Sequence, residues 1–266
     1  MKYLTWLTDI HLEFLESYEV NDFIQRIANT PSEIILIGGD IGVASNIQIY
    51  LALLEKILKR PIYFVLGNHD FYGGSIEQVR LSVKKLISQS RWLRWLTVSG
   101  VVELSQNTGL IGHDSWADGR LGNAFYSEVL LNDFFRIKEL TGLTTKERFL
   151  KLNALGDEAA RYFQTILPLA VKRYSNLILL THVPPFKEAS WHEGKISDDE
   201  FLPHFTCSVV GNVLVKVMQE NPQCHLTVLC GHTHSEGEAS ILPNLYVKTG
   251  GAVYGSPQSQ KLIKIQ

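Results

Sequence analysis

Short apolar runs alternate with longer amphipathic segments along this chain. Nearly continuous apolar runs, which are typical of strands buried on both faces, occupy residues 2–8, 33–37, 62–66, 176–180 and 226–230. Apolar residues three and four positions apart instead predict helices over 20–28, 47–59 and 75–90. This alternation predicts an α/β fold with a mostly parallel sheet covered on both faces.

The pattern changes after residue 90. Close apolar runs at 93–96, 98–104 and 108–111 predict a meander of three strands. The following polar, Gly-rich segment, residues 112–132, is long for a plain connection. The remaining expected elements are helices at 133–140 and 207–220 and strands at 239–242, 245–247 and 262–265.

A capping box predicts where the longest helix begins. Thr144 and Glu147 are three residues apart, so each can hydrogen-bond the other's backbone at a helix start. The helix is expected to run to about Val171, with a break near Pro168. No repeat, low-complexity segment or linker interrupts the sequence, and we interpret residues 1–266 as one domain.

Polar turns follow the buried runs. They contain Asp9-Ile10-His11, Asp40, Asn68-His69-Asp70, His182 and His232-Thr233-His234. Five of the nine histidines lie in these turns, which is a concentration that random placement would not give. Because functional residues in such sheets gather beyond the carboxyl ends of the strands, we expect these side chains to meet.

The residue types in these turns indicate a metal site. Carboxylate, imidazole and amide groups together suit Mn, Fe or Zn. The set is too large for one tetrahedral ion, and it fits two ions that share a carboxylate. Any one turn alone could be an ordinary Asx turn. A zinc finger built on Cys224 and Cys230 does not have the required spacing, so Cys230 is expected in the core.

In this order the turns resemble the calcineurin-like metallophosphoesterase superfamily. The resemblance runs from Asp9 to His234 and so covers nearly the whole chain. It implies a four-layer αββα sandwich, in which two mixed β-sheets pack face to face with flanking helices. It also implies a hydrolase with a binuclear metal centre.

The resemblance gives each turn residue a role. It implies three metal-ligand groups, which are Asp9, His11 and His234 at the first ion, Asn68, His182 and His232 at the second, and Asp40 bridging both. His69 would be a catalytic residue that faces the phosphoryl group. The implied reaction is direct attack of a metal-bridging hydroxide on a phosphate ester, with His69 neutralising charge and protonating the departing alkoxide. Asp70 would either orient His69 or cap a helix.

The sequence indicates the substrate class less directly than it indicates the metal ligands. Protein phosphatases of this superfamily carry Gly-Asp-x-Val-Asp-Arg-Gly, whereas Asp40 here is followed by Ile-Gly-Val-Ala-Ser, which puts that activity in doubt. The chain looks more like small bacterial-type phosphoesterases and cyclic-nucleotide-type phosphodiesterases, so the expected substrate is a phosphodiester or a small phosphomonoester. His113, Asp114 and Arg120 lie outside the general pattern and are candidate substrate-binding residues, with ordinary loop and surface roles as the alternative.

Charge and composition limit which binding partners are expected. The formal net charge of -2 gives no basic field, which disfavours duplex nucleic acid and leaves a nuclease as an alternative within the same chemistry. A non-catalytic metal-binding scaffold of the same fold is the alternative from another class, and it predicts gaps in the ligand set. Three cysteines and the absence of a long apolar run predict a cytoplasmic protein with no membrane partner. The sequence does not indicate an oligomeric state.

Overall fold

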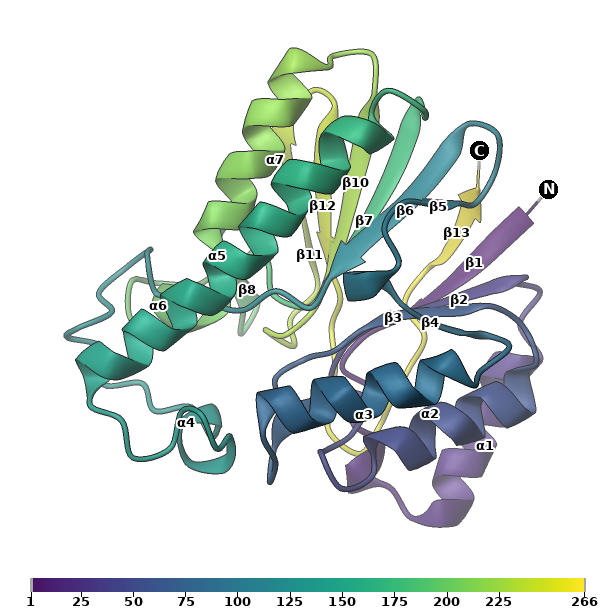
Figure 1. Cartoon of the computed structure of the whole chain (residues 1–266), viewed down its shortest axis with the longest axis horizontal. Helices are drawn as coiled ribbons and strands as arrows, with labels where there is room; N and C mark the ends of the chain where they lie inside the picture. Colours follow the sequence, from purple (N-terminus) through teal and green to yellow (C-terminus); the bar gives the residue numbers. More distant parts are fainter. Residues whose placement is uncertain (1, 266) are drawn as a thin grey trace.

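The computed structural model describes residues 2–265 and contains two β-sheets packed face to face (Figure 1). The strands of the first sheet lie in the order β13 (Leu262–Ile265), β1 (Lys2–Leu7), β2 (Ile34–Gly38), β3 (Ile62–Val65) and β4 (Leu93–Trp95). Those of the second lie in the order β11 (Gly237–Leu242), β12 (Leu245–Thr249), β10 (His225–Cys230), β7 (Asn176–Thr181), β6 (Thr108–His113) and β5 (Val102–Glu103). Neighbouring strands are parallel except at β13, β11 and β5, so both sheets are mixed.

Helices cover the outer face of each sheet (Figure 1). The first sheet carries α1 (Ser17–Ala28), α2 (Ile47–Leu58) and α3 (Ile76–Ser88), and the second carries α5 (Thr145–Ala170) and α7 (Ser208–Glu220). The connections contain α4 (Asp133–Arg136), α6 (Leu202–Phe205), the hairpin β8 (Trp191–His192) and β9 (Lys195–Ile196), and the 3-10 turns η1 (Leu12–Phe14), η2 (His69–Phe71), η3 (Leu96–Val98) and η4 (Lys187–Ala189). The predicted four-layer αββα sandwich is confirmed.

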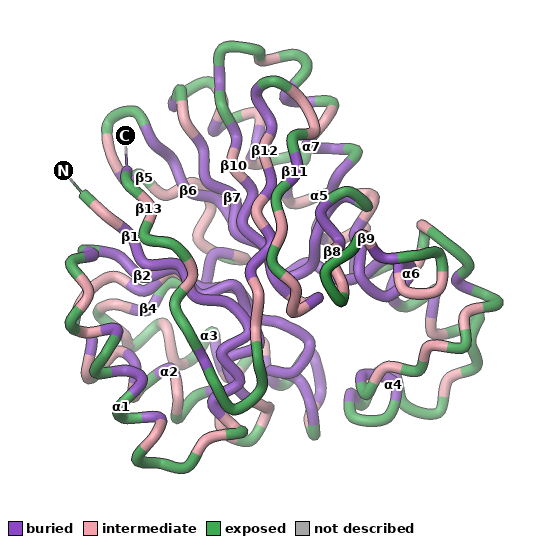
Figure 2. Tube along the Cα trace, turned by 180° about the vertical axis from the view of Figure 1, so that it is seen from behind, coloured by how far each residue is buried: buried purple, intermediate pink, exposed green. Residues whose placement is uncertain are grey.

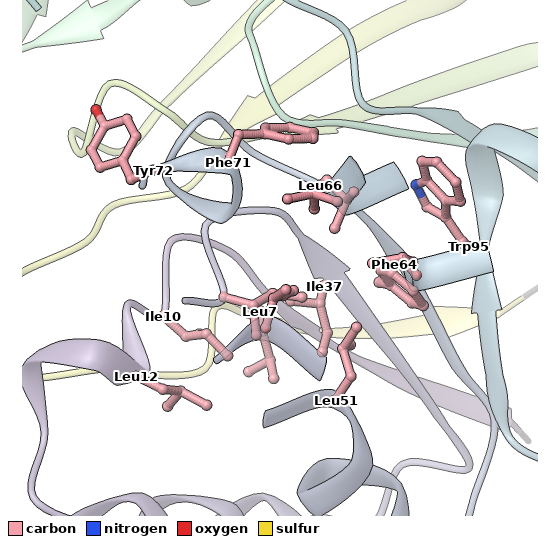
Figure 3. Packing of buried hydrophobic residues seen from close by; sticks show 14 of the residues in the cluster. Leu7, Ile10, Leu12, Ile37, Leu51, Phe64, Leu66, Phe71, Tyr72 and Trp95 are labelled. Carbon is pink, nitrogen blue, oxygen red and sulfur yellow. The ribbon is translucent and has the colours of Figure 1, made fainter. Parts of the chain in front are cut away.

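Burial on both faces explains the continuous apolar strands. In β2, Ile35 and Ile37 pack toward the helices, in the cluster shown in Figure 3. Ile34 and Leu36 belong instead to a second cluster, which includes Ile178 of the opposite sheet. Successive side chains of a strand point to opposite faces, so both of its faces must be apolar here. Figure 2 shows the result as buried strands at the centre and exposed helix surfaces outside.

The predicted meander over residues 93–111 is wrong. Strand β4 pairs with β3 in the first sheet, whereas β5 and β6 form a hairpin in the second. Residues 96–98 form a 3-10 turn, and Leu96 is fully buried among residues of the cluster between the sheets. The chain crosses from one sheet to the other at this point. Apolar runs identify strands, but they do not tell which sheet a strand joins.

Helix α5 begins as predicted and runs without a break to Ala170, close to the expected end at Val171. Thr144 accepts a hydrogen bond from the backbone N–H of Glu147, and the Glu147 carboxylate accepts one from the backbone N–H of Thr144. The predicted break at Pro168 is wrong, because Phe163, Leu167 and Ala170 are all buried and hold both sides of the proline against the second sheet. Among helices within residues 2–265, none, α5 included, is both long and apolar enough to cross a membrane.

Candidate metal centre

The polar turns meet where the carboxyl ends of the two sheets face each other (Figure 1). Turns after β1, β2 and β3 bring Asp9, His11, Asp40 and Asn68 from the first sheet, and turns after β7 and β10 bring His182, His232 and His234 from the second. Most of these side chains are buried, and His232 and His234 are half-buried. The structure therefore assembles all seven predicted ligands at one place.

The first donor group consists of Asp9, His11, Asp40 and His234. Each offers a ligand atom within 4.8 Å of those of the others. The Nε2 atoms of His11 and His234 are 3.0 Å apart, and His234 Nε2 is 3.6 Å from Asp9 Oδ1. Two carboxylates and two imidazoles at this separation form a set that suits a borderline divalent cation.

The second donor group consists of Asn68, His182 and His232. Asn68 Oδ1 lies 3.0 Å from His182 Nε2 and 3.0 Å from His232 Nδ1, and the two ring nitrogens are 3.2 Å apart. The other nitrogen of each ring donates to a carbonyl oxygen, at Gly38 for His182 and at His204 for His232. A neutral imidazole carries one proton, so the inward nitrogens present lone pairs.

Asp40 lies between the two groups. Its Oδ1 is 3.5 Å from His182 Nε2 and its Oδ2 is 3.7 Å from His11 Nε2. Gly67 leaves room for this carboxylate, because an added Cβ would approach Asp40 Oδ1 to 2.1 Å. Burial, and then repulsion by Asp9, raises the pKa of Asp40. A cation between the carboxylates would remove that repulsion.

The residues present therefore fit metal ions on chemical grounds. Three lone-pair atoms, on Asn68, His182 and His232, face one another with no proton between them, which is repulsive without a cation. Burial lowers the pKa of His232 to about 3, so its ring is neutral at physiological pH and available as a ligand. Among the described residues, Asp9 and Asp40 form ion pairs only with histidines.

Several of these residues adopt a strained backbone. Positive φ angles occur at Asp9, His11, Asp40, His232 and His234, with values from 42° to 71°. Residues other than glycine rarely adopt this left-handed backbone conformation, which costs of order 1–3 kcal/mol per residue. Gly39, beside Asp40, also has a positive φ, of 92°. Strain of this kind collects at functional sites.

Asp133 fixes the orientation of Asn68, and sequence reasoning missed it. Asn68 Nδ2 donates to Asp133 Oδ1 at 2.8 Å, which turns Asn68 Oδ1 toward His182 and His232. Tyr72 donates to the same Asp133 oxygen at 2.6 Å. Residues that orient a ligand in this way tune a metal site. The sequence gives no signal for Asp133, because it lies 65 positions from Asn68.

Glu13 is a second residue that sequence reasoning missed. Its Oε1 lies 3.3 Å from Nδ1 of His69 and 3.3 Å from Nδ1 of His11. Burial lowers the pKa of His69, and the hydrogen bond to Glu13 opposes that effect. His69 also stacks on Tyr72 at 4.2 Å between ring centroids. The available signal was spacing, since Glu13 follows His11 by two residues just as His11 follows Asp9.

Asp70 joins two of the turns. Its Oδ1 accepts hydrogen bonds from the backbone N–H groups of Ile41 and Gly42, both at 2.9 Å, and its Oδ2 accepts one from Gly67 at 2.8 Å. The carboxylate thus connects the turn after β2 to the turn after β3. Glu13, rather than Asp70, is the carboxylate that contacts His69.

The three candidate substrate residues make intramolecular contacts. His113 ends β6 and accepts a hydrogen bond from the Ser115 backbone N–H. Asp114 has no exposed surface, and its Oδ1 accepts from Leu66 N, Trp95 Nε1 and Thr97 Oγ1. Arg120 pairs with Asp157 at 2.8 Å and with Asp118 at 3.5 Å. Substrate contact by His113, Asp114 and Arg120 stays a prediction.

Comparisons with known proteins agree with the family resemblance seen in the sequence. The family model described as calcineurin-like phosphoesterase matches residues 3–236. No curated protein matches the chain by sequence. A phosphopantetheinyl hydrolase from Mycobacterium tuberculosis is similar in structure, with a TM-score of 0.66 and 11% identity over 94% of this chain and 89% of that one. A dimetal phosphatase from Danio rerio gives a TM-score of 0.58 and 13% identity over 94% of this chain and 87% of that one. At these identities the two structures support the fold alone.

Proposed function

The chain belongs to the calcineurin-like phosphoesterase family, and from this premise we propose that it hydrolyses small phosphate esters with two divalent transition-metal ions as cofactors. The substrate would be a phosphodiester or a small phosphomonoester. The observation that carries the proposal is the convergence of unprotonated donor atoms from Asn68, His182 and His232 next to the carboxylate-rich group around Asp40. Mn, Fe or Zn would suit these donors.

The donor atoms divide into two proposed ligand sets. They are Asp9, His11 and His234 for one ion, Asn68, His182 and His232 for the other, and Asp40 for both. The position of Asp40 supports the sharing, since each of its oxygens faces a histidine of a different set. When bound, the two ions would supply a hydroxide nucleophile at neutral pH and positive charge for the phosphoryl oxygens.

His69 is the proposed catalytic residue of the chain itself. Its backbone N–H donates to Asp40 Oδ1 at 2.9 Å, which holds it beside the proposed metal sites. Glu13 accepts the Nδ1 proton and favours the imidazolium form, in which Nε2 carries the second proton and can donate it to the leaving oxygen. The protonated ring also neutralises charge that develops on the phosphoryl group.

Metal analysis and a substrate panel test this proposal. We expect the purified protein to bind two transition-metal ions per chain, to hydrolyse aryl phosphate monoesters or diesters, and to lose and regain activity on chelation and reloading with Mn. Asp40→Asn and His69→Ala are expected to reduce turnover strongly, whereas Asp22→Asn, at an exposed position of helix α1, serves as a matched control. A protein that hydrolyses neither ester with any added metal, whether or not it binds metal, would be a scaffold, and the proposal would be wrong.

A further inference from the structure

Two aromatic side chains lie exposed beside the candidate metal centre. Phe14 ends the turn η1, and Tyr254 lies in the connection between β12 and β13. Their ring centroids are 4.8 Å apart, and they remain 52% and 49% exposed. Single exposed apolar residues are normal, whereas two adjoining exposed rings form an apolar surface that a ligand ring can contact.

Tyr254 connects this pair to the proposed chemistry. Its ring centroid lies 4.6 Å from that of His11 and 4.7 Å from that of His234. Its hydroxyl is 3.5 Å from His69 Nε2, the atom that faces the leaving oxygen in the proposed reaction. A group attached to that oxygen would therefore lie against Tyr254, with Phe14 beside it.

A neighbouring cleft has a different character. It has a volume of about 740 Å³, reaches Asp9 and His234, and is lined by charged groups that include Glu236, Lys248 and Lys261. A charged or hydroxylated substituent would suit this cleft. The surface formed by Phe14 and Tyr254 instead offers two ring faces tilted by 52°, which suits one planar ring stacked on one face and in edge contact with the other.

We propose that Phe14 and Tyr254, whose rings pack against each other, form an aromatic platform for the leaving group and select phosphate esters whose leaving group carries an aromatic ring. The proposal rests on the phosphoesterase function proposed above, because that function places the leaving oxygen at His69. The two rings act as specificity-determining contacts. They contribute by stacking on the leaving group and not by transferring a proton.

Benzyl phosphate and ethyl phosphate provide a matched test, because both release an alkoxide of similar basicity and only one carries a ring. We expect the wild-type protein to favour benzyl phosphate in kcat/KM by about fivefold to tenfold, as one stacked ring contributes. Phe14→Ala and Tyr254→Leu should bring the ratio toward one. Tyr254→Phe should keep it, since the ring remains, and Tyr126→Ala, at an exposed loop position, should leave both rates unchanged.

Binding of phosphonates gives a readout that does not depend on turnover. Calorimetry on the Mn-loaded protein should show tighter binding of benzylphosphonate than of ethylphosphonate, and Phe14→Ala should remove the difference. Equal binding of the two phosphonates and equal hydrolysis of the two esters by the wild-type protein would overturn the role of the aromatic platform and leave the proposed function intact. An equal loss of kcat/KM for both esters in Phe14→Ala would also overturn the proposal, because an equal loss indicates a structural role for Phe14. No hydrolysis of either ester, nor of an aryl phosphate diester, by the metal-loaded protein would instead overturn the proposed function.

Discussion

Replacing Glu13 by glutamine is expected to slow hydrolysis of esters with poor leaving groups by about tenfold. Burial opposes ionisation of Glu13, but hydrogen bonds from His11 and His69 outweigh it and lower the pKa of Glu13 to about 2. Glu13 is therefore a carboxylate at neutral pH and supports a protonated His69. Glu13→Gln keeps the shape of the side chain and removes its charge.

The magnitude follows from the kind of hydrogen bond that is lost. A hydrogen bond to a charged group contributes roughly 1.5–3 kcal/mol, and a neutral one about 1 kcal/mol. The substitution should therefore remove about 1.4 kcal/mol of stabilisation from protonated His69, which corresponds to about tenfold in rate. Only reactions that need a proton on the leaving oxygen should be affected to this extent.

Two aryl esters separate this effect from damage to the metal site. The assay compares kcat for phenyl phosphate, which has the poorer leaving group, with kcat for 4-nitrophenyl phosphate, and metal content is measured on the same samples. We expect the variant to slow phenyl phosphate hydrolysis selectively, and Glu33→Gln, at an exposed position before β2, to slow neither. If the variant slows hydrolysis of both esters equally and loses metal, the substitution acts through the proposed metal ligand His11. If it slows neither ester, Glu13 has no part in the mechanism.

Three further predictions concern metal binding and stability. Asp133→Ala should free the Asn68 amide and weaken metal binding by about 10- to 100-fold, measured by competition with a chelator, and unchanged affinity would contradict the orienting role. Chelation should lower Tm by about 5–10 °C, because an ion at ~100 times its Kd stabilises the folded state by about 2.7 kcal/mol, and an unchanged Tm would argue against ligands on both sheets. Burial lowers the pKa of His113 to about 3, below the usual 6.5, so the unfolded chain takes up the proton first as the pH falls. Between pH 6.5 and 3 this residue should therefore destabilise the fold by about 1.4 kcal/mol per pH unit, and chemical denaturation of His113→Gln should show a shallower acid dependence than the wild type.

The sequence predicted the parts of the site that depend on local rules. Asp9, Asp40 and Asn68 each follow a strand that is buried on both faces, and the carboxyl ends of such strands gather at one edge. The order of these turns also identified the sandwich, which periodicity alone did not. The strand boundaries at 2–7 and 62–65 fall within one residue of the predicted runs, because apolar burial defines them.

The parts of the fold and site that the sequence did not predict depend on packing between distant segments. Glu13 reaches His69 because η1 packs beside the turn after β3, and this contact spans 56 positions. Asp133 reaches Asn68 from a short helix in a long connection. The assignment of β4 and β5 to different sheets was missed for the same reason, since pairing partners are not a local property.

The division of the donor groups between the two sheets has a consequence for biosynthesis. The first group needs His234 in addition to Asp9, His11 and Asp40, and the second needs His182 and His232 in addition to Asn68. A chain emerging from the ribosome thus exposes early donors long before either group can be completed. If these groups hold metal as proposed, the ions enter only after the second sheet has been made and joined to the first. Metal capture would then be a late step that marks a chain whose two halves have been assembled correctly.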